Sequence, residues 1–416
     1  MNDARHVTVV GAGIVGIASA LNLQRDGFDV TLVDKGPPGE GASLGNAGVM
    51  GACAVVPVPT PGIWKKIPGM WLDPMGPLSL NVPYALRKLP WFRDYLRNST
   101  KKRVETIASG LTDILSGSVE EHQRLAKGTR AAGWIEPAPY IYLYPDEAAF
   151  RSERFAWELR ERHGAEYDVL RNGEVQDLDP AIAPEYRFAL ALKHHGFIRD
   201  PLSLVQAHAE DFVRNGGIIL QREITDVEIG PDGPEHLVTP DGLLDVDLLL
   251  ICAGAWSGKL AARLGTPVPL ESERGYHVVL TNPGVTPKYP IMSTSGKFVA
   301  TPMSMGLRLA GLVEFACLDA PPDYKRARTL LKHAERLFPG VRTEDFTEWM
   351  GHRPALPDSL PVIGRSPVFD NVYFAFGHQH VGLTGGPKTG RLIADMIQGR
   401  TPNIDMERYA ITRFAA

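Results

Sequence analysis

Three glycines near the start of the chain have the spacing of a phosphate-binding turn. Gly11, Gly13 and Gly16 follow a short apolar run, residues 7–10, and precede a stretch of helical periodicity, residues 17–25. In such a turn the first glycine permits the sharp bend, the second lets the backbone approach a pyrophosphate, and the third lets the helix pack on the strand. These residue types and positions predict binding of an adenine dinucleotide.

An acidic side chain stands where the second strand of this unit should end. A β-branched run over residues 29–33 follows the helix, and Asp34 comes roughly 20 residues after the last glycine. A carboxylate at this place accepts hydrogen bonds from a ribose 2′-hydroxyl and repels a 2′-phosphate. Because the strand, the glycines, the helix, the second strand and the acid follow one another in the order and spacing of the motif, a tight turn without a ligand is a poor explanation of this pattern. The motif alone does not separate NAD from FAD.

A glycine-rich loop follows this acid. Residues 36–48 contain too many glycines for a regular helix. The side chains of Ser43 and Asn46, with the free backbone amides around them, could wrap phosphates or a flavin ring. A mobile surface loop would have the same composition. Sequence alone supports the two interpretations about equally.

Composition indicates an ordinary globular protein with room for two domains. The chain has 416 residues, of which 44% are hydrophobic and 22% are charged. Its formal net charge of −4 argues against nucleic acid as a partner. The three cysteines lack metal-ligand spacing, and no apolar run reaches the ~18 residues that a membrane-spanning helix needs. We expect a cytoplasmic protein with reduced thiols and no leader sequence.

The periodicity along the rest of the chain predicts two kinds of sheet. Elements of dinucleotide-fold character recur at both ends and in the middle, and the material between them indicates a separate antiparallel sheet. The predicted strands include residues 140–144, 188–192, 218–220, 224–229, 243–251, 276–280, 297–302, 306–312 and 372–376. The predicted helices include residues 82–89, 91–97, 101–130, 146–162, 200–214, 324–337 and 387–398. The predicted fold class is α/β, with a Rossmann-like domain and a discontinuous antiparallel-sheet domain.

One stretch combines aromatic and basic side chains. Residues 63–103 hold nine Lys or Arg against two Asp, together with three tryptophans. Tryptophan with Lys and Arg is typical of a segment that lies at a membrane surface without spanning it. A lid of the substrate domain, with aromatic residues in its core and charges in solvent, explains the same composition equally well.

Together the motifs resemble the FAD-dependent D-amino acid oxidase superfamily, and within it the bacterial D-amino acid dehydrogenases of the small-subunit type. The resemblance covers nearly the whole chain and rests on the segments VVGAGIVG (9–16), SLGNAG (43–48), CAGAWS (252–257), RGYH (274–277), GLRLAG (306–311), RPALPDSLPVIG (353–364), GH (377–378) and GLTG (382–385). It implies a glutathione-reductase-type FAD-binding domain and a substrate-binding domain. We expect the first over residues 1–55, 145–260 and 345–416, and the second over residues 56–144 and 261–344.

The resemblance also implies which residues hold FAD and substrate. The implied cofactor-binding residues are Gly11, Gly13, Ile14, Val15, Gly16, Asp34, Lys35, Ser43, Asn46, Ala47, Gly48, Val227, Ala253, Gly254, Trp256, His378, Val381, Gly382, Leu383 and Thr384. Arg353 matches the arginine that holds the substrate carboxylate, a task that suits its planar fork of donors, and a structural salt bridge is the alternative. Tyr276 matches a tyrosine that shares this task, but it could equally be a core residue. His378 and His380 could bond flavin or substrate, or could simply be packing residues.

The resemblance implies oxidation of an amine without a metal or a nucleophilic side chain. A D-amino acid or related imino acid would lose a hydride from its α-carbon to flavin N5, and a quinone-type acceptor would take the electrons. In this family residues 63–103 resemble a segment linked to membrane association, which suggests a peripheral position on the inner face of the cytoplasmic membrane. The alternatives are an oxygen-using oxidase of glycine, sarcosine or another secondary amine, a hydroxyproline-type imino acid dehydrogenase, and a flavin-containing subunit without turnover.

Overall fold

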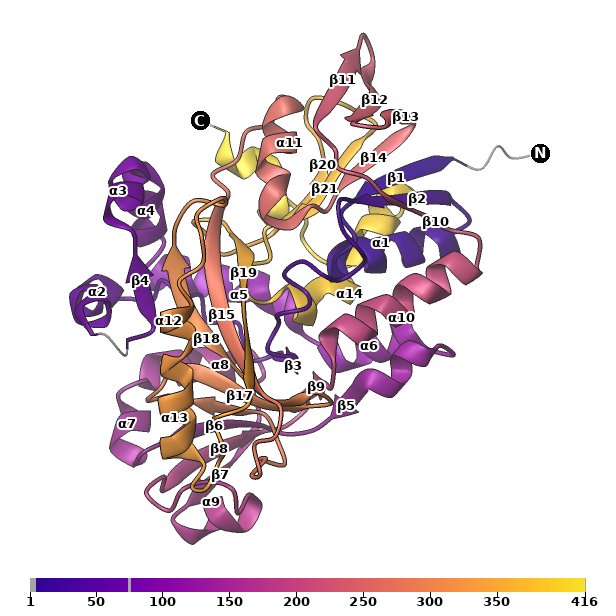
Figure 1. Ribbon diagram of the computed structural model, residues 1–416. Helices are drawn as coiled ribbons and strands as arrows, with labels where there is room; N and C mark the ends of the chain where they lie inside the picture. Colours follow the sequence, from indigo (N-terminus) through magenta and orange to yellow (C-terminus); the bar gives the residue numbers. More distant parts are fainter. Residues whose placement is uncertain (1–4, 74–75, 416) are drawn as a thin grey trace.

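The computed structural model describes residues 5–73 and 76–415, and the chain forms two large sheets (Figure 1). The first has six strands in the order β10-β2-β1-β14-β21-β20. All neighbours are parallel except β20 and β21. These strands are β1 (His6–Val10), β2 (Asp29–Asp34), β10 (Ile218–Gln221), β14 (Leu248–Ile251), β20 (Val362–Arg365) and β21 (Val372–Phe376). The parallel order brings the carboxyl ends of β1, β2 and β14 to one edge, where dinucleotides bind in such sheets.

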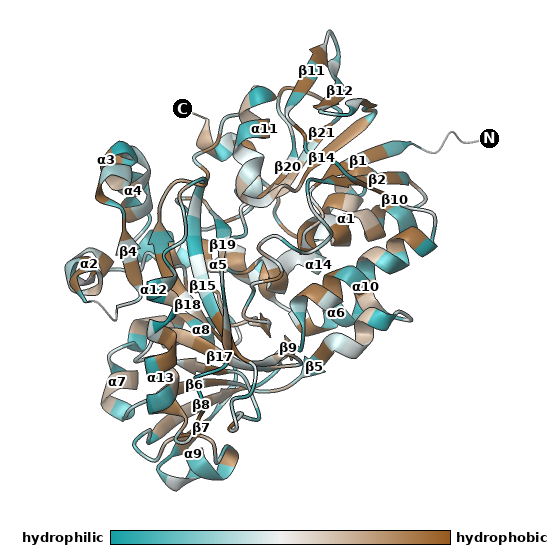
Figure 2. Cartoon of the chain, viewed as in Figure 1, coloured by the Kyte–Doolittle hydropathy of each residue, from teal (hydrophilic) through white to brown (hydrophobic). Residues whose placement is uncertain are grey.

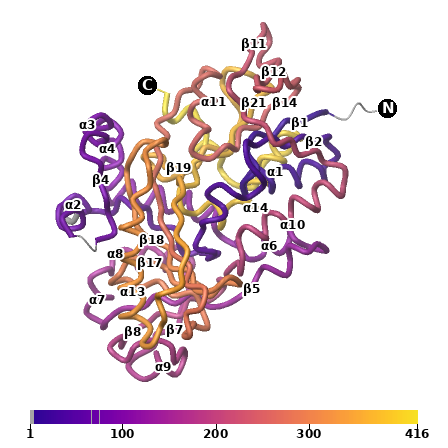
Figure 3. Tube along the Cα trace, in the orientation of Figure 1, coloured from indigo at the N-terminus to yellow at the C-terminus, as the bar shows by residue number. Residues whose placement is uncertain are grey.

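Helices α1 (Ile14–Arg25), α10 (Pro201–Arg214) and α14 (Gly382–Ile397) pack beside this sheet. Figure 3 shows them running close together, and α1 contacts both of the others. Their apolar sides and the strands of the sheet form the largest buried cluster of the chain, and these strands are brown in Figure 2. Helices α5 (Lys101–Leu115) and α6 (Ser118–Ala126) lie against α14. The first sheet thus has a helical layer that carries the start of α14.

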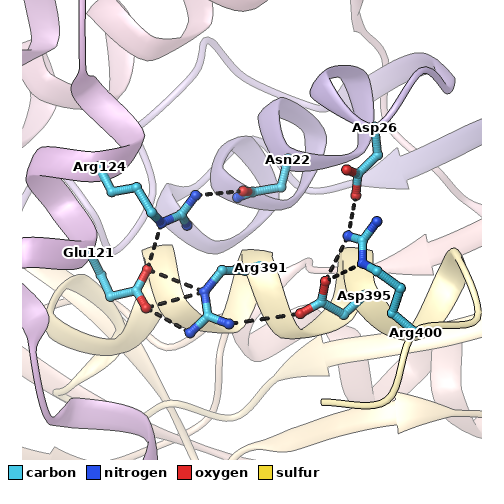
Figure 4. Close-up of polar contacts among 7 residues, drawn as sticks. All are labelled: Asn22, Asp26, Glu121, Arg124, Arg391, Asp395 and Arg400. Atoms are coloured by element: carbon cyan, nitrogen blue, oxygen red, sulfur yellow. Dashed lines mark hydrogen bonds and ion pairs between the residues drawn. The ribbon is translucent and has the colours of Figure 1, made fainter. Parts of the chain in front are cut away.

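An ion-pair network fastens α14 to α1 and α6 (Figure 4). The Nη2 atom of Arg391 in α14 lies 2.7 Å from Oε1 of Glu121 in α6. Asp26 follows the C-terminal end of α1 and Arg400 follows that of α14, and Arg400 Nη2 lies 2.6 Å from Asp26 Oδ2. The network comprises Asn22, Asp26, Glu121, Arg124, Arg391, Asp395 and Arg400. Because several partly buried charges act together, the network fixes α14 better than an isolated surface pair would.

The second sheet has nine strands, eight of them in the order β19-β15-β18-β17-β16-β6-β8-β7, with β4 pairing β18. It is antiparallel except where β16 meets β6 and β18 meets β4. Its strands are β4 (Leu78–Leu80), β6 (Tyr140–Tyr144), β7 (Tyr167–Arg171), β8 (Phe188–Leu192), β15 (Glu271–Leu280), β16 (Ile291–Ser293), β17 (Phe298–Met303), β18 (Gly306–Phe315) and β19 (Phe346–Ala355). Helices α12 (Tyr324–Ala327) and α13 (Thr329–Leu337) cover one of its faces with a second apolar cluster.

Smaller elements complete the chain. Two three-stranded sheets consist of β11 (Asp226–Gly230), β12 (Gly233–Thr239) and β13 (Gly242–Asp245), and of β3 (Val49–Met50), β9 (Gly196–Ile198) and β5 (Ile135–Pro137). The remaining α-helices are α2 (Ile63–Leu72), α3 (Val82–Arg87), α4 (Leu89–Arg97), α7 (Glu147–Arg151), α8 (Arg154–Arg162), α9 (Gly173–Leu178) and α11 (Ser257–Arg263). Helices α2, α3 and α4 lie together at one side of the molecule, beside the second sheet (Figure 1).

Several predicted elements are divided in the structure. The helix expected over 101–130 breaks at Gly117, whose φ of +68° is a left-handed conformation that ends a helix. The strand expected over 243–251 is two strands in different sheets, β13 and β14. The helices expected over 146–162 and 324–337 each divide in two. The last helix begins at Gly382, five residues earlier than expected, and tolerates Pro387 in its interior.

The pairing of strands also divides the chain differently from the expected domains. β7 and β8, inside 145–260, and β19, inside 345–416, belong to the second sheet. Helices α5 and α6, inside 56–144, pack against α14 of the first sheet. The pairings of β6 with β8 and of β15 with β19 join segments that the expected limits place in different domains. We therefore propose domain limits that follow the two sheets.

Candidate functional site

A cavity of about 1330 Å³ lies between the two sheets. Its walls come from the glycine turn after β1, the loop after β2, the turn after β14, strands β15, β18 and β19, and the start of α14. Pockets for small molecules commonly measure about 300–1,000 Å³. This cavity therefore has room for a dinucleotide and a small substrate together.

The glycine turn shapes the part of the cavity at the edge of the first sheet. Gly11 has a φ of +112°, and a Cβ atom there would lie 2.9 Å from the backbone nitrogen of Ala253, so only glycine fits. A Cβ atom on Gly13 would meet a single atom within 4 Å, the Ser43 hydroxyl at 3.4 Å. Gly13 thus presents bare backbone to open space, which fits the approach of a pyrophosphate.

Asp34 ties the glycine turn to the loop that follows β2. Its Oδ2 accepts a hydrogen bond from the Ala12 amide at 2.7 Å, and its Oδ1 accepts one from the Gly36 amide at 3.0 Å. Each carboxylate oxygen can accept a second hydrogen bond, so the side chain can also receive a ribose hydroxyl. The Lys35 ammonium lies 4.0 Å from the centre of the Trp256 ring, which joins this wall to the turn after β14.

The loop of residues 36–48 is anchored on both sides, in contrast to the interpretation as a mobile surface loop. The Ser43 hydroxyl accepts a hydrogen bond from the Ile14 amide at 3.0 Å. Nη1 of Arg308 donates to the carbonyls of Leu44 at 2.8 Å and Asn46 at 2.7 Å. Burial lowers the pKa of Arg308 to about 10, so the side chain stays charged at neutral pH. The loop is therefore part of the cavity wall.

Helix α14 directs its N-terminus at the cavity. Gly382, Leu383 and Thr384, which line the cavity, lie in its first turn instead of preceding the helix. The free backbone amides and the positive end of the helix dipole favour negative charge there. Pro387 has no N–H to donate to the Leu383 carbonyl four residues earlier. Nε2 of His122 lies 2.8 Å from that oxygen and takes the place of the missing donor.

We predict that replacement of His122 by Phe will loosen the first turn of α14. His122 is fully buried, which lowers the pKa to about 4, so at neutral pH it is an uncharged donor through Nε2. Loss of the bond leaves a buried carbonyl unpaired and should lower the free energy of unfolding by about 1–3 kcal/mol. Thermal unfolding and FAD retention on gel filtration would measure the effect. His122→Gln, whose amide can donate, should recover part of it; equal losses in both variants would contradict the assigned bond.

The two histidines before α14 have different surroundings. Nε2 of His378 lies 2.9 Å from the Thr389 hydroxyl in α14, and burial lowers the pKa of His378 to about 4. This contact supports the packing interpretation of His378, although the residue also lines the cavity. The exposed surface of His380 lines the cavity, and the burial of this site within the molecule lowers the pKa of His380. Of the two, His380 is the better placed for contact with a ligand.

Arg353 lies in the cavity wall at the edge of the second sheet. Its Nη1 donates to Oε1 of Glu273 and to the Leu312 carbonyl, both at 3.0 Å. Leu312 has a φ of +61°, a left-handed conformation that is costly for a side chain of this kind. A Cβ atom on Gly275 would lie 2.8 Å from Arg353 Nε, so this glycine leaves the room that the guanidinium occupies. Arg353 is thus both paired and cavity-lining.

The hydroxyl of Tyr276 does not join Arg353 in this structure. It donates to Oε2 of Glu314 at 2.5 Å and accepts a hydrogen bond from the Asp323 amide at 3.0 Å. The ring is 2% exposed and belongs to the apolar cluster that α12 and α13 cover. Although the residue borders the cavity, its hydroxyl is bonded on the other face of the sheet. The geometry favours the core interpretation of Tyr276 over a role in carboxylate binding.

Most of the other residues expected at the cofactor line the cavity. They are Ile14, Val15, Lys35, Ala47, Ala253, Gly254, Trp256 and Val381. Gly16, Gly48 and Val227 do not. Gly16 packs on the Gly11 carbonyl, and Gly48, with a φ of +77°, packs against β9. Val227 is fully buried in an apolar cluster, whereas its neighbours Thr225 and Asp226 line the cavity. Actual contact with FAD stays a prediction for every residue of the set.

The cavity-lining residues of the second sheet that were not predicted from the sequence include Glu273, Trp349 and His352. The Trp349 ring stacks on His277 with 5.2 Å between ring centres and fills the space above Gly45. His352 Nδ1 lies 2.8 Å from the Ser272 hydroxyl. For Trp349, alternation along β19 was an available signal, because positions 349, 351 and 353 share a face. The position of Glu273 opposite Arg353 required the register between β15 and β19.

Comparison with known protein families matches residues 6–396 to the family described as FAD dependent oxidoreductase. A D-amino-acid oxidase from Bradyrhizobium diazoefficiens is 38% identical over 421 residues, which cover all of both chains. A D-amino acid dehydrogenase from Paramagnetospirillum magneticum is 29% identical, with 99% of each chain covered.

Solved structures share the fold at low sequence identity. Glycine oxidase from Geobacillus kaustophilus superposes with a TM-score of 0.73 at 22% identity, covering 99% of this chain and 100% of that one. L-proline dehydrogenase from P. horikoshii superposes with a TM-score of 0.71 at 19% identity, covering 100% and 98%. The arrangement of the two sheets therefore recurs in these proteins.

Proposed function

Because the chain belongs to the family of FAD-dependent oxidoreductases, we propose that it oxidises a D-amino acid or a related imino acid and passes the electrons to a quinone-type acceptor. The names of the two curated relatives, at 38% and 29% identity over essentially the whole chain, support a D-amino acid as substrate. The observation that carries the proposal is the position of Arg353, a guanidinium in the wall of a cavity large enough for cofactor and substrate.

The cavity residues suit the FAD that this family uses. Bound FAD would accept the hydride that leaves the substrate carbon next to nitrogen. The bare backbone at Gly13 would take the pyrophosphate, and the Asp34 carboxylate would receive a ribose hydroxyl. The N-terminus of α14 would face groups that become negative when the flavin is reduced. The second sheet forms the opposite wall of the cavity and would cover the substrate and exclude water from it.

Arg353 has donors to spare for a carboxylate. Its Nη1 atom serves Glu273 and Leu312, and Nη2 makes one long contact of 3.4 Å with the Gly311 carbonyl. Among the described residues, the Nε atom of Arg353 has no hydrogen-bond partner. Nε and Nη2 form the side of the guanidinium that binds a carboxylate through two parallel hydrogen bonds. In this way Arg353 would fix the substrate with its α-carbon toward the flavin.

A panel of substrates with a dye as electron acceptor tests the proposal. D-amino acids and cyclic imino acids should reduce the dye, and the matching L-amino acids, glycine and sarcosine should do so far more slowly. Turnover confined to glycine, sarcosine or L-amino acids would contradict the assignment to D-amino acids. Absence of turnover with every amine, in protein that carries FAD, would favour a flavin-containing subunit instead.

The electron acceptor is a separate question, and oxygen is the second candidate because the 38% identical relative is named an oxidase. Peroxide formed per substrate consumed in air, compared with reduction of a soluble quinone under nitrogen, separates the two. A quinone-type acceptor predicts little peroxide and fast quinone reduction. Stoichiometric peroxide with slow quinone reduction would assign the protein as an oxidase.

Within residues 63–103, the exposed side chains of α2 support a membrane contact, whereas the buried side chains of α4 support a packing role. On α2, Trp64 is 59% exposed and Trp71 is 42% exposed, whereas Trp91 and Tyr95 on α4 are buried against β18. Residues 74–75 and the side chain of Lys66 lie outside the described residues. In the part of the chain that the structure describes, no helix is long and apolar enough to span a bilayer. We propose that α2 lies on the surface of anionic lipid, on the inner face of the cytoplasmic membrane.

We predict that the holoenzyme sediments with anionic vesicles and that the double variant Trp64→Ala/Trp71→Ala sediments much less. The two exposed rings supply apolar area, and the exposed basic residues nearby supply attraction that salt weakens. Binding should therefore fall from low to moderate salt. Val368→Ala removes an equally exposed apolar side chain elsewhere and should bind like the wild type. Absence of binding by the wild type at low salt would refute the membrane contact.

A further inference from the structure

Glu273 is a buried carboxylate in the cavity wall with one oxygen unused. The residue is 2% exposed and lines the cavity beside Arg353. Its Oε1 accepts the hydrogen bond from Arg353 Nη1 at 3.0 Å. Its Oε2 is buried and has no hydrogen-bond partner within residues 5–73 and 76–415. A buried acceptor without a partner destabilises the fold, and more so when it is charged, so this oxygen points to a ligand that donates to it.

The groups around Glu273 come from three other elements. Arg353 faces it directly across the β15–β19 ladder. Burial, with a contribution from the Glu273 charge, raises the pKa of Tyr95 on α4, so this phenol stays neutral. His380, after β21, is close enough for the charges of Glu273 and Arg353 to act on its pKa in opposite directions. Arg353 is the one permanent cation of this group, and it already occupies the other oxygen of Glu273.

We propose that Oε2 of Glu273 binds the amino nitrogen of the substrate while Arg353 binds its carboxylate. This inference rests on the proposed oxidation of an amino acid. The ion pair presents an anion and a cation side by side, which matches the ammonium and carboxylate of a zwitterion. A carboxylate accepts N–H from an ammonium or from a neutral amine, so it holds the nitrogen in either protonation state. Glu273 is thereby a specificity-determining residue that selects amino acids over plain carboxylic acids.

Rejection of plain acids follows from the same geometry. A carboxylic acid without an amino group would satisfy Arg353 but leave Oε2 of Glu273 unpaired. It would also bring a second negative charge close to the first in a desolvated site. A hydrogen bond to a charged group contributes about 1.5–3 kcal/mol, which corresponds to roughly 10- to 100-fold in affinity.

Two unreactive ligands of the FAD-loaded wild type test the inference. The first is 2-methylalanine, a zwitterion without a hydrogen on its α-carbon, and the second is isobutyrate, the same acid without the amino group. Titration followed by flavin absorbance should give a Kd at least about tenfold lower for 2-methylalanine. Equal affinities, or tighter binding of isobutyrate, would overturn the inference. This comparison requires no variant to fold.

The variant Glu273→Gln replaces Oε2, the oxygen to which we assign the amino group of the substrate. Its amide oxygen can still accept from Arg353, but its NH2 group cannot accept from an amine. Affinity for 2-methylalanine should fall at least about tenfold and affinity for isobutyrate should hold or rise, whereas a merely structural role would weaken both. Glu314→Gln is the matched control, because Glu314 bonds Tyr276 on β15 and does not line the cavity.

The two proposals fail in different ways. If D-amino acids reduce the flavin but the wild type binds both ligands equally, the inference about Glu273 is wrong and the proposed function stands. If no D-amino acid or imino acid reduces the flavin, the proposed function is wrong whatever the ligand titrations give.

Discussion

Replacement of Arg353 by Ala should lower kcat/KM for the D-amino acid substrate by about a thousandfold while FAD stays bound. The change removes the cation that would bind the carboxylate and leaves the buried Glu273 charge without its partner. Truncation of one partner of a buried, hydrogen-bonded charge pair costs about 2–5 kcal/mol in binding, and a thousandfold loss in kcat/KM corresponds to about 4 kcal/mol. Steady-state turnover with a dye acceptor measures the loss, and the absorbance ratio of flavin to protein checks that FAD is present.

Arg353→Lys is the matched variant. It keeps the positive charge beside Glu273 but loses the planar fork, so kcat/KM should fall less than in the alanine variant. A loss of turnover in Arg353→Ala that is accompanied by loss of FAD would indicate a structural role. Turnover within threefold of wild type in FAD-loaded Arg353→Ala would contradict substrate binding by this side chain.

Replacement of Gly13 by Val should abolish tight FAD binding without unfolding the apoprotein. The new side chain would enter the open space in which we place the pyrophosphate, since only the Ser43 hydroxyl lies within 4 Å of a Cβ atom there. Gly13 also has an ordinary extended backbone, with a φ of −75°, so a side chain causes no strain. We expect the Kd of FAD to rise at least about 100-fold, the loss of roughly 3 kcal/mol of contacts.

Fluorescence titration of the deflavinated protein with FAD measures this change, and circular dichroism of the apoprotein checks the fold. Gly133→Val is the control, because a Cβ atom at Gly133 would meet nothing within 4 Å and the residue does not line the cavity. Retention of wild-type FAD affinity in Gly13→Val would place the pyrophosphate elsewhere.

Local patterns in the sequence predicted the nucleotide-binding unit well. The family resemblance, the FAD cofactor and the α/β fold class are confirmed, and the second sheet, expected to be antiparallel, contains two parallel pairs. Strand β1, the glycine turn, α1 and β2 are contiguous, so each could be predicted from its neighbours. The same holds for α10, whose start is marked by the cap of Asp200 and by Pro201.

Predictions that depend on distant parts of the chain were weaker. The domain limits that we propose differ from the expected ones because β6 pairs with β8, β15 pairs with β19 and α5 packs on α14, and each of these contacts joins segments far apart in sequence. The surroundings of the Tyr276 hydroxyl depend on which face of β15 the helices α12 and α13 cover, and these helices follow later in the chain. Glu273 could not be found, because its significance comes from the register that sets it opposite Arg353.

Anaerobic mixing of the FAD-loaded protein with a D-amino acid tests the central claim most directly. We expect the yellow flavin absorbance to bleach in a single turnover with the D-enantiomer, one keto acid to form for each flavin reduced, and the L-enantiomer to leave the colour unchanged. A flavin that stays oxidised with every D-amino acid and imino acid, in protein whose FAD dithionite can reduce, would contradict it.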